Sequence, residues 1–207
     1  MTVVSRSALI YLMINKREAF SFGLSAFKKN WGPFVTIAIF VVLFEILGFV
    51  LHKKNPFFGI SDVVTLVGGA IAELGFTTLS LKVIDGKRVN FSDIFTNRKL
   101  LIPFSLVFIS YSLLIRIGFM LFVIPGIILG ARLFSAPYLV VDKNLSYKEA
   151  FKTSWKLTRG KTIKLILFQL SILAVIILGL LTLGVGILIS IPVIEIASVY
   201  VYKKLTS

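Results

Sequence analysis

The chain contains no cysteine, a single histidine and only nine acidic residues among its 207. Without cysteine, disulfide bonds, thiolate catalysis and cysteine-ligated metal clusters are all excluded. His52 has no metal-ligand residues at a useful spacing, and the sequence has no P-loop, H-E-x-x-H or Gly-rich dinucleotide motif. Hydroxyl nucleophiles have no histidine base near them. We therefore expect no metal, no cofactor and no enzymatic activity.

Charge is also scarce, because only 15% of the residues are charged whereas 57% are hydrophobic. A soluble domain has about 25% charged and about 45–50% apolar residues. The composition therefore predicts an all-α membrane protein. The net charge of +14 does not indicate nucleic acid binding, since basic residues in such a protein orient the spans and contact lipid headgroups.

The apolar runs predict six transmembrane helices, since a span needs about 20 apolar residues. Together they form a single membrane domain over residues 1–207, arranged as three hairpins. The predicted spans cover about residues 31–51, 62–84, 100–121, 125–141, 163–181 and 184–202. Spans three and four form one long apolar run, and we expect their outer turn between Arg116 and Gly126. Pro137 and Pro192 are expected to interrupt spans four and six.

Lysine and arginine are concentrated on one side of this predicted topology. Of the 23 basic residues, only Lys53, Lys54, Arg116 and Arg132 fall outside the N-terminal segment, the second and fourth loops and the C-terminus. Because short basic loops are retained in the cytoplasm, the pattern places both termini there and the protein in the cell (inner) membrane.

An internal repeat precedes the first and fifth spans, where Glu18-Ala19-Phe20 aligns with Glu149-Ala150-Phe151. Each copy predicts an amphipathic interfacial helix, over about residues 16–29 and 146–159, and residues 91–98 form a weaker third copy. Ser146 and Glu149 form an S-x-x-E capping box. Tyr147, Ala150, Phe151 and Trp155 share one face of this helix. The pattern thus predicts three units, each an interfacial helix followed by a hairpin, and suggests that they form a pseudo-threefold bundle.

The stretches VIPGIILGAR and SYKEAFKTSWKLTRGK carry a family resemblance. They resemble a broad prokaryotic family of uncharacterised six-helix membrane proteins, related to the membrane domain fused to some glycerophosphodiester phosphodiesterases. The shared positions are Pro125, Gly126, Arg132, Pro137, Ala150, Ser154, Leu157, Thr158 and Gly160. The resemblance implies membrane placement and a lipid or envelope context. It implies no hydrolase activity, because the soluble phosphodiesterase domain is absent.

Five ionisable residues fall inside the predicted spans, where each costs about 2.5–3.5 kcal/mol on insertion scales. They are Glu45, Glu73, Arg116, Arg132 and Glu195. Their depth predicts an outer pair of Glu45 with Arg116, and a group of Glu73, Arg132 and Glu195 nearer the midplane. Two interpretations stay open, because such pairs can hold the bundle together or line a cavity for an ion, a proton or a polar headgroup.

The interfacial helices also carry basic residues suited to anionic lipid, since each attracts such lipid by about 1 kcal/mol. The candidate contacts are Lys28, Lys29, Lys148, Lys152, Lys156, Arg159 and Lys161. We therefore expect a non-enzymatic, lipid- or envelope-associated membrane protein or complex subunit, with a membrane-protein partner or a second copy as a further option. The alternative is a small transporter or channel that uses buried Arg/Glu pairs.

Overall fold

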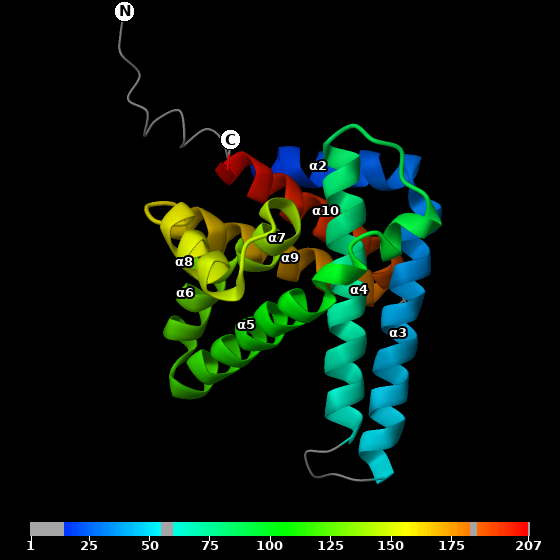
Figure 1. The fold of residues 1–207 in the computed structure, drawn as a ribbon, viewed down its shortest axis with the longest axis horizontal. Coiled ribbons are helices and arrows are strands. Elements are labelled where there is room, and N and C mark those ends of the chain that lie inside the picture. The colour runs from blue at the N-terminus through cyan, green and yellow to red at the C-terminus, as the bar shows by residue number, and fades with distance from the viewer. Residues whose placement is uncertain (1–14, 55–59, 183–185, 207) are drawn as a thin grey trace, which may run out of the picture.

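A computed structural model of the chain describes residues 15–54, 60–182 and 186–206, and every element in these ranges is helical (Figure 1). The elements are α2 (Lys16–Lys29), α3 (Trp31–Lys54), α4 (Ile60–Ile84), η1 (Phe91–Phe95), η2 (Arg98–Leu100), α5 (Leu101–Leu121), α6 (Val123–Leu133), α7 (Ala136–Lys143), α8 (Tyr147–Leu157), α9 (Thr162–Leu181) and α10 (Ile187–Thr206).

In the part of the chain that the structure describes, five helical segments are long and apolar enough to cross a membrane, which supports the predicted class of protein. They are Trp31–Leu51, Val64–Ile84, Phe91–Leu121, Val123–Lys143 and Thr162–Leu181. The turn between the third and fourth lies at Phe122, inside the predicted interval. The fourth segment is broken after Leu133, as Pro137 predicts, because α7 begins anew at Ala136. The expected interruption at Pro192 is wrong, because α10 continues through this residue from Ile187 to Thr206.

The predicted sixth span corresponds to α10, which is not among these five segments. Glu195, Lys203 and Lys204 make α10 more polar than the others. It is also an enclosed helix, with ten buried residues, and it packs against α2, α3, α4 and α9. By contrast, α3 and α9 direct many large apolar side chains outward. The surroundings of α10 are therefore largely protein, which lets it carry a buried carboxyl group.

The short helices match the sequence prediction in two cases out of three. α2 coincides with the predicted helix, and α8 begins with the predicted capping box of Ser146 and Glu149. The predicted helix over residues 91–98 is wrong, because this stretch forms two 3₁₀ turns. Asp93 fixes the first turn by accepting from the Asn90 N–H at 2.9 Å and pairing with Lys82 at 2.7 Å.

η1 and α8 each pack on the helices of the preceding unit, and α2 packs on the last helix of the chain. η1 contacts α3 and α4, α8 contacts α5, α6 and α7, and α2 contacts α10. In Figure 1, α2 lies across one end of the molecule beside α10, although the two are at opposite ends of the sequence. Ala19 and Ala150, the central residues of the aligned repeat, are both fully buried at these contacts. The three units are thus linked in a ring.

Candidate functional site

A cavity of about 770 Å³ lies among α4, α5, α6, α7, α9 and α10. Its walls are mostly aliphatic and aromatic, and Leu170 and Leu173 of α9 line it although each is half exposed at the outer surface. The cavity therefore reaches the outside of the bundle along α9. Its volume falls within the range of about 300–1,000 Å³ that is common for small-molecule sites. The polar side chains in its lining are Glu73, Tyr111, Tyr138, Gln169, Glu195 and Ser198.

Two carboxyl groups meet in this cavity. Glu73 of α4 and Glu195 of α10 both line it. Thr77, one turn after Glu73 on α4, donates a hydrogen bond to Oε1 of Glu195 at 3.3 Å, and Tyr138 lines the same cavity. Glu195 is only 7% exposed, whereas Glu73 is partly exposed because it faces the cavity. The structure therefore brings together two of the five predicted charged residues.

Arg132 does not join this pair, so the predicted midplane group of three is wrong. In the described ranges, neither Glu73 nor Glu195 forms an ion pair with a lysine or arginine. Arg132 lies in the last turn of α6, with its guanidinium carbon 4.3 Å from the centroid of the Trp155 ring. The break after α6 brings this end beside α8, and the long side chain reaches an aromatic partner there.

The residues of α8 that carry the family resemblance have a structural role at the break between α6 and α7. Oγ of Ser154 and Oγ1 of Thr158 both donate to the main-chain carbonyl of Arg132 at 3.0 Å. The N–H of Ser135 donates to Oγ of Ser154 at 3.2 Å. Ala150, Ser154 and Thr158 are fully buried, whereas Tyr147 and Trp155, predicted on the same face as Ala150, are more than a third exposed. These residues therefore fix the joint between α6 and α7.

Glu45 and Arg116 share a second, smaller cavity of about 230 Å³, which Thr65 and Ser112 also line. Both charged side chains are exposed rather than buried. Within the described part of the chain they form no ion pair with each other. The structure thus places both residues around one small cavity on the outside of the bundle, without the predicted ion pair.

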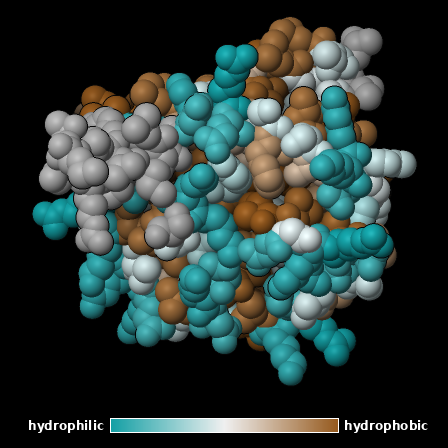
Figure 2. Space-filling model, turned by 90° about the horizontal axis from the view of Figure 1, so that it is seen from above, coloured by the Kyte–Doolittle hydropathy of each residue, from teal (hydrophilic) through white to brown (hydrophobic). Residues whose placement is uncertain are grey.

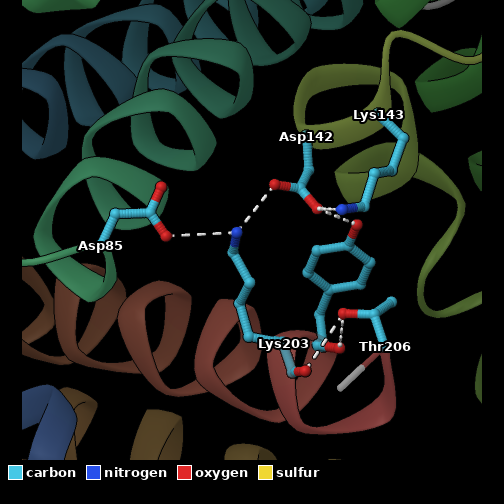
Figure 3. Close-up of polar contacts among 6 residues, drawn as sticks. Asp85, Asp142, Lys143, Lys203 and Thr206 are labelled. Atoms are coloured by element: carbon cyan, nitrogen blue, oxygen red, sulfur yellow. Dashed lines mark hydrogen bonds and ion pairs between the residues drawn. The ribbon is translucent and has the colours of Figure 1, made fainter.

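A polar junction joins three elements at one end of the bundle (Figure 3). Lys203 of α10 lies 2.8 Å from Oδ1 of Asp142 at the end of α7 and 3.2 Å from Oδ1 of Asp85 after α4. Tyr202 donates to Oδ2 of Asp142 at 2.7 Å. Burial alone would lower the pKa of Lys203, but its bonds to Asp142 and Asp85 raise that pKa. No local sequence pattern indicates this junction, because its members are far apart in the chain.

The seven candidate lipid contacts lie on α2, α8 and the turn after α8. Six are exposed, and Lys161 is half-buried, with burial lowering the pKa of its amine. Figure 2 looks onto the end of the molecule that carries α2, where hydrophilic side chains gather around apolar ones. This end is therefore more polar than the outward faces of α3 and α9.

Long apolar helices around a largely apolar cavity indicate a polytopic helical membrane protein. The chain belongs to a family of proteins of unknown function, DUF975, which matches residues 96–207. The match begins just before η2, so it contains Arg132 and Glu195 but not Glu73.

Similar curated proteins are uncharacterized proteins of Mycobacterium tuberculosis and Mycobacterium bovis. Each is 33% identical over 135 residues, which cover 64% of this chain. The matched region spans about two fifths (40%) of the length of those relatives. No solved structure matches the chain.

Proposed function

We propose that this chain is a non-enzymatic integral membrane protein that binds a membrane lipid or another amphiphile in the cavity between α4 and α10. The observation that carries the proposal is the cavity itself, whose walls are apolar and which reaches the outer surface along α9. An acyl chain or a hydrophobic small molecule fits such walls, and the carboxyl and hydroxyl groups of the lining offer polar contacts.

The proposed topology has six spans, with α10 as the sixth and both termini in the cytoplasm of the cell membrane. The even number of spans and the basic segments α2 and α8 support this orientation. In it, α2 and α8 lie in the inner headgroup layer and their exposed lysines contact anionic lipid. The proposed kinship with the membrane domain of glycerophosphodiester phosphodiesterases is consistent with a lipid context.

Blocking the cavity tests the proposal. We expect Leu173→Trp to reduce the amphiphile retained by the purified protein at least several-fold, because Leu173 lines the cavity. Leu178→Trp is the matched control, since Leu178 is an exposed residue of the same helix outside the cavity lining. Mass spectrometry of the protein released from mild detergent measures retention and also whether anionic lipid is kept over zwitterionic lipid.

Equal retention by the two tryptophan variants, or a wild-type protein that retains nothing, would contradict binding in the cavity. No preference for anionic lipid would contradict the role of the basic residues on α2 and α8, while leaving the cavity proposal intact.

A small transporter is the second candidate, and the carboxyl pair in the cavity favours it. Ionisable groups inside a membrane bundle often lie on ion or proton pathways. The Arg/Glu pairs expected from the sequence no longer motivate this function, because Arg132 lies elsewhere. Flux of a bound ligand into proteoliposomes tests it, and a protein that binds ligand but never transfers it would exclude transport.

A further inference from the structure

We infer that the cavity takes a lipophilic organic cation, which is held by the carboxyl groups of Glu73 and Glu195 in competition with a proton. The inference rests on the proposed binding of an amphiphile in this cavity and adds the charge of the ligand. It follows from three observations: the facing carboxyl groups, the aromatic lining and the missing basic partner.

The facing carboxyl groups define the charge of the site. Glu73 and Glu195 line one largely apolar cavity, where two like charges repel, so ionisation removes a proton from only one of the two carboxyl groups. The pair then carries one negative charge. In a site of low polarity, such a charge is costly unless a cation or hydrogen bonds compensate it.

No lysine or arginine with a described side chain supplies this compensation. Among residues 15–51, 64–182 and 186–206, whose side chains the structure describes, neither carboxyl group forms an ion pair with a basic residue. The other titratable groups in the cavity lining are Tyr111 of α5 and Tyr138 of α7, which are neutral hydroxyl donors. α6 and α9 contribute no ionisable side chain to the lining. A monovalent ligand cation is therefore the complement that the site lacks.

The rest of the lining suits a cation with apolar substituents rather than a hydrated metal ion. Five aromatic side chains line the cavity: Phe108, Tyr111, Phe119, Phe134 and Tyr138. Aromatic faces attract organic cations, and the effect grows when water is excluded. An anionic headgroup is disfavoured, because it would be placed beside the negative pair.

Cation binding and a second proton on the pair exclude each other. At low pH the pair holds two protons and is neutral, so an entering monocation must displace one proton to water. The net charge of the occupied site is then zero, as before. The affinity for the cation should therefore fall by up to tenfold per pH unit once the pair takes up its second proton, because one proton is exchanged per cation.

Tetraphenylphosphonium and tetraphenylborate test the inference, because they share one shape and carry opposite charges. We expect saturable binding of tetraphenylphosphonium to the detergent-solubilised full chain by titration calorimetry, weaker at low pH, and no saturable binding of tetraphenylborate. Each single Gln substitution leaves one carboxyl group that can ionise, so only the double variant, Glu73→Gln with Glu195→Gln, should weaken tetraphenylphosphonium binding at least tenfold. Glu45→Gln should not, because Glu45 lies in the other cavity.

Several results separate the inference from the proposed function. Equal binding of both probes, or an unchanged affinity in the double variant, would overturn the cation site while leaving amphiphile binding supported. Binding of neither probe, together with no retained amphiphile, would overturn both. If the double variant does not fold, the pH dependence of the wild-type protein decides the test, because a tetraphenylphosphonium affinity that does not fall at low pH would overturn the cation site.

Discussion

Gly126→Ala is expected to lower the free energy of unfolding by about 1–3 kcal/mol, as overpacked sites do. A Cβ atom at Gly126 would lie 2.7 Å from Cγ of Phe119 and 2.8 Å from its main-chain nitrogen. A Cβ atom at Gly118 would likewise lie 2.8 Å from Cα of Gly126. The backbones of α5 and α6 are thus in direct contact, and no side-chain rotation relieves the clash.

Gly69→Ala is the matched control for this substitution, because the atoms nearest to its added Cβ are 3.8 Å away in the Phe108 ring. Alanine also favours a helix over glycine by up to about 1 kcal/mol, so the control should be neutral or stabilising. Thermal unfolding in mild detergent measures both variants. A Gly126→Ala protein as stable as the control would contradict the close approach of α5 and α6.

Asp142→Asn is the second substitution for which we expect a large effect, also about 1–3 kcal/mol, the usual range for hydrogen bonds to charged groups. The Asp142 side chain is only 10% exposed and holds Lys203 and the hydroxyl of Tyr202. An amide at this position removes the charge that pairs with Lys203 and replaces one acceptor oxygen by a donor group. The junction between α7 and α10 should therefore loosen.

Asp85→Asn provides the comparison, because Asp85 pairs with the same lysine but is 42% exposed. Exposed ion pairs contribute about 0–1 kcal/mol, so this variant should unfold close to the wild-type temperature. Chemical and thermal unfolding of both variants in the same buffer and detergent measure the two losses of stability. If Asp85→Asn and Asp142→Asn lower the free energy of unfolding equally, burial of the Asp142 carboxylate does not strengthen its contacts.

The sequence predicts helix positions well because long apolar runs and capping residues act locally. The limits of α2, the capping box at Ser146 and the break near Pro137 all follow from neighbouring residues. The failure at residues 91–98 is local too, because the Asp93 contacts to Asn90 and Lys82 favour a tight turn over an amphipathic helix.

Pairing of charged residues was harder to predict, because depth along a span says nothing about which face of a helix a residue occupies. Glu73, Arg132 and Glu195 lie at similar predicted depth, yet only the two carboxyl groups face one cavity. Opposite charge favoured Arg132 as a partner, but the break after α6 brings it beside Trp155. The junction at Asp142 depends on how α4, α7 and α10 converge, which no local pattern encodes.

Cross-linking between α4 and α10 tests most directly whether these helices bring Glu73 and Glu195 together. The natural chain has no cysteine, so Glu73→Cys with Glu195→Cys introduces the only two thiols. A protease site inserted between α7 and α8 would separate the two fragments on a denaturing gel. We predict that a short bifunctional thiol reagent, applied in membranes, keeps the fragments of the double variant linked, while each single variant separates. If the fragments of the double variant separate although both thiols are modified, the placement of Glu73 and Glu195 beside each other in one cavity would be contradicted.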